Sequence, residues 1–282
     1  MIVKRVFVFL FLLSATQLVA QSDKIDSLLN DLVFNQEDPF LVKMDDELKY
    51  DFLYTGVNYS NNSYYAGREI GDQINNFSGH IFYYNYIGFF LGASGLFYNQ
   101  LTPNYNNATF SAGYNTFINK KKTLSFRTSY SRYEYFNPDT SSYYPHKNNF
   151  NLGLSFRKKW LGARVSHNVL FGDYFSNNLL TAINLRFTIL RLGKFNKIYT
   201  MPELSAFFSS ETITITGVPT DKFGLLNTQL SLPISIALHD FDIEANYYIN
   251  FPSSLDETIA YPVSSFFSVS VNYLLPIIRK KP

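Results

Sequence analysis

The amino-acid sequence predicts an all-β chain that folds as a closed antiparallel barrel of about twelve strands and crosses a membrane. Three observations lead to this prediction. Segments of about ten residues alternate between apolar and polar side chains, as membrane strands do. Short turns and longer polar loops alternate between these segments. Residues 1–20 have the layout of an export signal.

The alternation is clearest in residues 147–174. Successive side chains of a strand point to opposite faces, so Leu152 and Leu154 share one face while Asn151 and Ser155 share the other. After a short basic turn the same pattern resumes. In water this alternation indicates a half-buried sheet. Repeated along a whole chain behind an export signal, it indicates a barrel with lipid outside and a polar lumen.

The two ends of the chain set the cellular context. Residues 1–20 combine Lys4 and Arg5 with an apolar run at 6–13 and a small residue, Ala20, which predicts a cleaved signal peptide. The apolar run is too short for a membrane helix, which needs about 20 residues, and no later stretch is long enough. Residue 21 is Gln, so no lipoprotein anchor is expected, and the absence of Cys excludes disulfides.

Residues 21–46 differ from the rest of the chain because they are acidic and contain apolar residues at helical spacing around Leu28–Val33. Asp26 is placed to cap a short amphipathic helix, and Pro39 would end it. We interpret this segment as a periplasmic helix and linker. A plug inside the barrel and a poorly ordered tail are the alternatives.

The barrel is predicted to occupy residues 47–282. The strand segments expected from the alternation are 48–58, 77–84, 89–98, 108–118, 124–136, the two arms of the hairpin 148–174, 179–191, 197–209, 224–238, 241–251 and 265–275. Connections near residues 85, 119, 158, 193 and 239 are short, whereas those near 59, 99, 137, 211 and 252 are mostly longer. Short turns are expected on the periplasmic side and long loops outside. Pro202 interrupts the ninth strand, so ten or fourteen strands are also compatible with the pattern.

The amino-acid composition agrees with the prediction of a membrane-spanning barrel. Aromatic residues make up 18% of the chain, which suits aromatic girdles at two membrane interfaces. The net charge of +2 gives no indication of nucleic-acid binding. By its signal, alternation and loop rhythm the chain resembles bacterial outer-membrane β-barrel proteins. That resemblance implies an outer-membrane location, with membrane lipid and the barrel assembly machinery as partners. The residues after Tyr273 depart from the aromatic ending usual in this class.

Charged side chains on the polar face are the first candidate site. They are Arg127, Arg157, Arg164, Arg186, Glu203, Asp242 and Glu244. The favoured interpretation is an ionic network that fills and stiffens the lumen. The functional alternative is a constriction that selects ions or solutes by charge. Because the basic and acidic residues are separated in sequence, we expect them to face one another across the lumen.

Aromatic residues in the long loops are the second candidate site. The relevant side chains are Tyr64, Tyr65, Tyr105, Tyr143 and Tyr144. Tyrosines of this kind contact glycans or proteins by stacking and hydrogen bonding. They also occur at the headgroup interface with no partner, and this second interpretation is favoured.

No catalytic residue, metal site or cofactor is predicted. The sequence places no Ser on the same face as His146, His167 or His239. His80 shares a face with Ser78, which is a weak signal, and no G-x-S-x-G motif occurs. The leading hypothesis is a non-enzymatic barrel that acts as a narrow pore for a small solute or as a structural partner of a membrane protein. A loop-borne binding surface for a protein or glycan is the second hypothesis, and a lipid hydrolase within the barrel is the third.

Overall fold

The fold was analysed in a computed structural model that describes residues 50–69, 74–99, 106–136, 146–193, 196–215, 218–256 and 258–278. The predicted signal peptide and the acidic segment 21–46 lie outside the described residues. Within the described ranges, no helix is long and apolar enough to cross a membrane.

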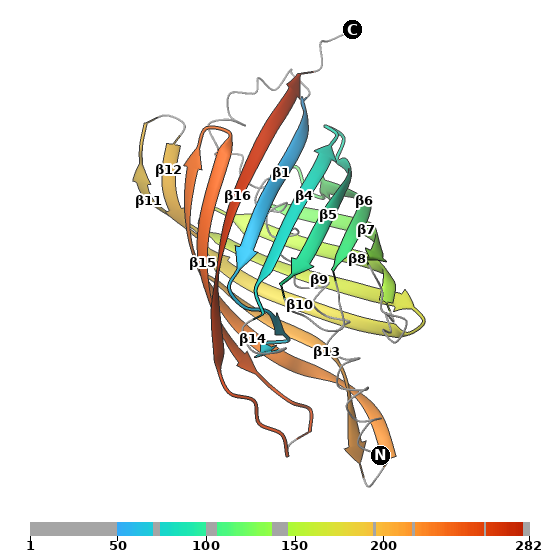
Figure 1. The fold of residues 1–282 in the computed structure, drawn as a ribbon. Helices are drawn as coiled ribbons and strands as arrows, with labels where there is room; N and C mark the ends of the chain where they lie inside the picture. Colours follow the sequence, from blue (N-terminus) through green and yellow to red (C-terminus); the bar gives the residue numbers. More distant parts are fainter. Residues whose placement is uncertain are drawn as a thin grey trace.

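The strands form one antiparallel sheet that closes on itself (Figure 1). Of its fourteen strands, twelve make the ring β1-β4-β5-β6-β7-β8-β9-β10-β13-β14-β15-β16, and β16 pairs with β1 to close it. The predicted all-β, twelve-stranded antiparallel barrel is therefore confirmed. The strands of the ring are β1 Tyr50–Ser60, β4 Asn76–Tyr84, β5 Phe89–Tyr98, β6 Asn107–Phe117, β7 Leu124–Tyr135, β8 His146–Lys158, β9 Leu161–Gly172, β10 Phe175–Leu185, β13 Glu203–Ile215, β14 Val218–Leu238, β15 Phe241–Pro252 and β16 Ser264–Ile278.

Four short strands lie outside the ring. β11 (Phe187–Arg191) follows β10, and β12 (Asn196–Thr200) precedes β13. These two strands pair with each other beyond the first residue of β9, and β12 also pairs with the last part of β14. The break between β12 and β13 contains Pro202, which has no N–H to donate to a ladder. The expected interruption of this strand is confirmed. β2 (Tyr64–Tyr65) and β3 (Arg68–Glu69) form a separate hairpin between β1 and β4.

One predicted loop is a ladder instead. Residues 211–223 were expected to be irregular, but β13 and β14 pair as far as Ile215↔Val218 and project beyond their neighbours (Figure 1). The reason is visible in residues 212–215, which alternate Thr and Ile and therefore favour an extended strand over a loop. We call the end of the barrel that carries this hairpin the long-loop end. The opposite end, with the tight connections before β5, β7, β9 and β15, is the short-turn end.

The two faces of the barrel differ in chemistry as the alternation predicts. On β8, Phe150, Leu152, Leu154 and Phe156 are exposed on the outer face, whereas Asn149, Asn151 and Ser155 are buried on the inner face. β16 follows the same rule, with Val269 and Val271 outside and Ser270 and Asn272 inside. An apolar outer wall around a polar interior is the pattern required of strands that face lipid.

Leu226 is an exception. The alternation places it on the outer face with Leu230, yet it is fully buried. A β-bulge explains the difference, because Phe207 pairs with Asn227 and Phe208 with Leu225, which leaves Leu226 as the extra residue. An extra residue reverses the facing of the strand beyond it.

An aromatic side chain lies flat against the inner wall where β4 and β5 meet. Phe82 is buried and covers Gly92 of the neighbouring strand, where an added Cβ would come within 2.3 Å of the Phe82 ring and 2.4 Å of the Ile81 carbonyl oxygen. Phe82 also packs edge-on to Phe90. Because Gly92 has no side chain, the Phe82 ring can occupy the space above it.

Replacing this glycine is expected to destabilise the barrel. Gly92→Ala would force the Phe82 ring and the backbone apart, and overpacking of this kind costs about 1–3 kcal/mol. Gly79→Ala, on the adjacent strand, is the control, because its Cβ would meet its nearest neighbour at an ordinary 3.7 Å. Urea unfolding of both variants in lipid vesicles measures the difference. Equal losses would show that the Phe82 ring does not depend on the glycine.

Candidate functional site

The charged residues selected from the sequence all come from the short-turn half of the barrel. Each lies within a few residues of a turn or a break in the sheet at the short-turn end of the barrel. Arg127, Arg157, Arg164 and Arg186 follow one another on β7, β8, β9 and the end of β10. The acids come from β13 and β15. The inner wall therefore carries a basic arc beside an acidic arc at one end, which we call the charge band.

The two arcs meet at an ion pair. Arg164 Nη2 donates to Glu203 Oε1 over 2.7 Å, and the two side chains are only 10% and 12% exposed. β10 is the single strand between β9 and β13, so this pair lies along the wall. The expectation that basic and acidic residues oppose one another across the lumen is wrong for this pair. The reason is that Glu203 begins β13 at the same end of the barrel as Arg164 on β9.

Arg186 and Asp242 are joined through Tyr199 of β12. The Arg186 guanidinium lies over the Tyr199 ring, with its Cζ 4.7 Å from the ring centroid. The Tyr199 hydroxyl donates to Asp242 Oδ2 over 2.8 Å. Tyr199 is buried, so its hydroxyl needs this acceptor. Tyr199 was not among the candidates chosen from the sequence. The signal that would have identified it is its position in the sequence between two inward-facing charges, Arg186 and Glu203.

Arg157 is the third basic member of the band that contacts its neighbours. Its Nη2 lies 3.4 Å from Asn184 Oδ1 and 3.3 Å from Met201 Sδ. Asn184 in turn donates to Glu203 Oε2 over 3.3 Å. Arg157, Asn184, Glu203 and Arg164 are therefore linked in one network, in which an amide bridges a guanidinium and a carboxylate.

Arg127 and Glu244 lie on opposite walls. Arg127 on β7 is buried with its Cζ 4.7 Å from the Phe90 ring centroid, and Glu244 on β15 accepts from the Ser235 hydroxyl over 3.2 Å. In the ring of twelve strands, β7 and β15 are half a circuit apart. For these two residues the expected opposition across the lumen agrees with the strand order.

Between the charge band and the long-loop end, the inner wall consists mainly of amides and hydroxyls. Asn151 donates to Ser166 Oγ over 2.6 Å and to Asn168 Oδ1 over 2.9 Å, and all three residues are buried. A second cluster joins Asn250 to Asn227 and Gln229 on β14. Because neutral amides both donate and accept, they satisfy one another without fixed charge. The charge on the inner wall is thus concentrated at the short-turn end.

Of the loop tyrosines, Tyr64 is packed inward. Its ring stacks on Phe266 of β16 at a centroid distance of 5.1 Å, and its hydroxyl donates to the Ser265 carbonyl oxygen over 3.0 Å. Tyr65 lies in β2, and Tyr105, Tyr143 and Tyr144 lie outside the described residues. Tyr64 is therefore partly occupied by contacts within the chain, and its suggested contact with a glycan, a protein or lipid headgroups stays a prediction.

The described histidines take separate places. His80 stacks on Tyr54 at 4.9 Å inside the barrel, whereas His239 contacts Asp240 in the turn before β15. His167 lies on the outer face opposite Leu152 and Leu179. Within the described ranges, no three acidic or histidine side chains gather in a way that would hold a metal ion.

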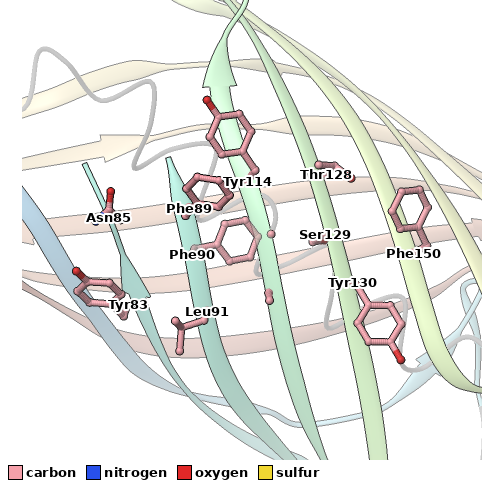
Figure 2. Close-up of a pocket in the computed structure, with 12 residues that line it drawn as sticks. Tyr83, Asn85, Phe89, Phe90, Leu91, Tyr114, Thr128, Ser129, Tyr130 and Phe150 are labelled. Atoms are coloured by element: carbon pink, nitrogen blue, oxygen red, sulfur yellow. The ribbon is translucent and has the colours of Figure 1, made fainter. Parts of the chain in front are cut away.

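A hollow lies on the outer wall. It has a volume of about 480 Å³ and is lined by aromatic and small residues of β5, β6 and β7 together with Phe150 (Figure 2). Phe89, Tyr114 and Tyr130 rim it, and Ala112 leaves room between them. Its lining is apolar and faces away from the charge band, so it belongs to the surface that meets lipid.

A closed antiparallel ring with an apolar outer wall and a polar inner wall defines a transmembrane β-barrel. No protein-family model matches the chain, and no curated protein matches its sequence. Among solved structures, it is similar to the NanC porin, at 8% identity over 79% of this chain and 98% of that chain, with a TM-score of 0.49. An outer membrane channel from Pseudomonas putida F1 is 9% identical over 83% of this chain and 97% of that chain, with a TM-score of 0.49. The KdgM porin is 12% identical over 79% and 98%, with a TM-score of 0.45. Because these values are low, the function has to be inferred from the chain's own residues.

Proposed function

We propose that the chain is an outer-membrane pore for small hydrophilic solutes and that the charge band is its selective part. The observation that carries this proposal is the clustering of all seven predicted lumen charges at the short-turn end of a wall whose middle consists mainly of neutral amides and hydroxyls. With short turns on the periplasmic side, the band lies at the periplasmic end of the lumen. Charged rings in a confined passage are known to set ion and solute preference.

The division of the band into a basic and an acidic arc suggests how it acts. A fixed positive arc beside a fixed negative arc produces a field across the passage, and confinement in a low-dielectric wall strengthens it. A solute that carries both charges, or a strong dipole, is oriented by such a field, whereas a simple ion is attracted to one arc only. The aromatic side chains of β4 and β5 complete the wall without adding charge.

Outer-membrane location is part of the proposal and has a direct test. The outward apolar surface of β8 and β16 requires lipid or detergent, so the mature chain should stay in the membrane fraction after a carbonate wash. Release by carbonate without detergent would contradict the proposed location.

Single-channel recording in a planar bilayer tests the pore. The expected result is a small conductance that shifts toward cation preference in Arg186→Gln, because removal of a fixed positive charge from the band lowers the barrier for cations. Arg132→Gln is the matched control. It removes the same charge from β7, but Arg132 lies on the outer face, exposed and paired with Glu134. A wild-type barrel with no conductance would indicate a packed ionic core.

A further inference from the structure

The connection between β1 and β4 contains the β2–β3 hairpin, residues 64–69, at the long-loop end of the barrel, and we call this hairpin the strap (Figure 1). Ala66 and Gly67 both have positive φ, 45° and 74°, as a tight two-residue hairpin turn requires. The short turn pairs Arg68 with Tyr65 across the hairpin.

The strap contacts residues that face into the barrel. Gly67 lies so close to Asn227 on the inner face of β14 that an added Cβ would be 2.3 Å from its Oδ1. The Ser264 hydroxyl of β16 donates to the Gly67 carbonyl oxygen over 2.7 Å. Tyr64 stacks on Phe266, which itself stacks on Tyr248 of β15 at 4.4 Å. A segment that follows β1 and touches the inner faces of β16 and β14 lies inside the ring at the long-loop end.

A buried ion pair fixes the far end of the strap. Arg68 Nη1 donates to Glu211 Oε1 of β13 over 2.7 Å, and the side chains are 10% and 8% exposed. Arg68 Nη2 also donates to the Ser253 carbonyl oxygen over 2.5 Å, and its guanidinium lies over the Tyr261 ring at 4.1 Å. β13 is four strands from β1 around the ring, so the pair joins distant parts of the wall.

The loop between β15 and β16 covers the same pair. Leu255 N donates to Glu211 Oε2 over 2.8 Å, and the Ser254 hydroxyl lies 3.4 Å from the same oxygen. A tyrosine hydroxyl is uncharged at neutral pH, and burial raises the pKa of the Tyr261 phenol further, so Tyr261 adds no negative charge beside Glu211. Glu211 thus accepts from three donors of two segments, as a buried carboxylate must.

We infer that the strap narrows the outer mouth of the lumen and sets the largest solute that can enter, and that the Arg68–Glu211 pair holds it in place. This inference rests on the proposed pore function, and it assigns size exclusion to the long-loop end and charge selection to the charge band. Because Arg68 and Glu211 neutralise one another, the mouth excludes by size without favouring either sign of charge.

Cysteine labelling tests the strap independently of conductance. The chain has no cysteine, so Ser231→Cys places a single thiol on the inner face of β14, further from the long-loop end than Asn227. Maleimide reagents of increasing size are added from outside to the barrel in sealed vesicles. With the strap in place, only the smallest should react. Adding Arg68→Ala or Glu211→Gln should raise the rate for the larger reagents several-fold and should raise single-channel conductance as well.

Two further variants separate release of the strap from general unfolding. The double variant Arg68→Glu with Glu211→Arg restores opposite charges and should recover much of the wild-type size limit. Arg132→Ala breaks an exposed ion pair on the outer face and should leave labelling unchanged. An unchanged size limit in Arg68→Ala and Glu211→Gln, with wild-type conductance present, would overturn the strap and leave the pore intact. Wider labelling without any conductance would keep the strap and overturn the pore.

Discussion

Leu152→Arg is expected to lower the free energy of unfolding by about 2–4 kcal/mol, the cost of a charged side chain on the lipid face near the bilayer midplane. Leu152 lies near the middle of β8, and its side chain points outward with 38% of its surface exposed. In the membrane that surface meets hydrocarbon, which cannot solvate a guanidinium. Urea unfolding in lipid vesicles measures the loss.

Gly153→Arg is the control for Leu152→Arg. It lies one residue further on, faces the lumen, and would place a Cβ no closer than 3.8 Å to any neighbour. We expect a smaller loss than for Leu152→Arg, because the guanidinium would enter the polar interior, where repulsion from Arg127 on the neighbouring strand accounts for the remaining cost. Asn151 is a poor control, since it is buried and hydrogen-bonded to Ser166 and Asn168. A larger loss for Gly153→Arg than for Leu152→Arg would mean that the two faces of β8 are exchanged.

Glu203→Ala is expected to cost about 3–5 kcal/mol, because it leaves the buried Arg164 guanidinium without its carboxylate partner. The loss should also remove the acceptor of Asn184 and loosen Arg157. Urea unfolding at neutral pH measures this loss in the free energy of unfolding. Arg164→Ala should lower the free energy of unfolding by a similar amount.

Two comparisons isolate the cause of this loss. Glu134→Ala breaks the exposed Arg132–Glu134 pair and should cost about 0–1 kcal/mol, as surface pairs do. Replacing both members of the buried pair, as in Arg164→Met with Glu203→Leu, should recover most of the lost stability, because no unpaired charge remains. A double variant as unstable as Glu203→Ala would indicate that the rest of the network needs Glu203 itself.

Most of the fold could be predicted from alternation alone. Each face of a membrane strand meets a uniform environment, so the side-chain pattern of strands such as β8 and β16 follows directly from the solvent on each side. The exceptions involve backbone features that composition does not encode. The bulge at Leu226 and the extension of β13 and β14 past residue 211 depend on pairing between strands, which alternation within one strand cannot specify.

The candidate site could be predicted only as a set of residues. Alternation identified which charges face inward. The position of each charge along the barrel axis, however, depends on the register of every strand around the ring. Arg164 and Glu203 are neighbours because β9 and β13 both have those residues near the short-turn end. The Arg68–Glu211 pair was missed because Arg68 lies in a connection, where no periodicity predicts which way a side chain points.

The closure between β1 and β16 has a consequence for how the barrel is made. β16 pairs with β1 from Tyr50↔Ile278 to Ser60↔Ser268 and with β15 on its other side, so this strand closes the ring. Until it does so, β1 and β15 each present an open edge of unpaired backbone groups, which lipid cannot satisfy and which other chains can pair with. Insertion therefore has to be nearly all-or-none. A chain that lacks Ser264–Ile278 should accumulate as an aggregation-prone intermediate in the aqueous compartment, even though every other strand is intact.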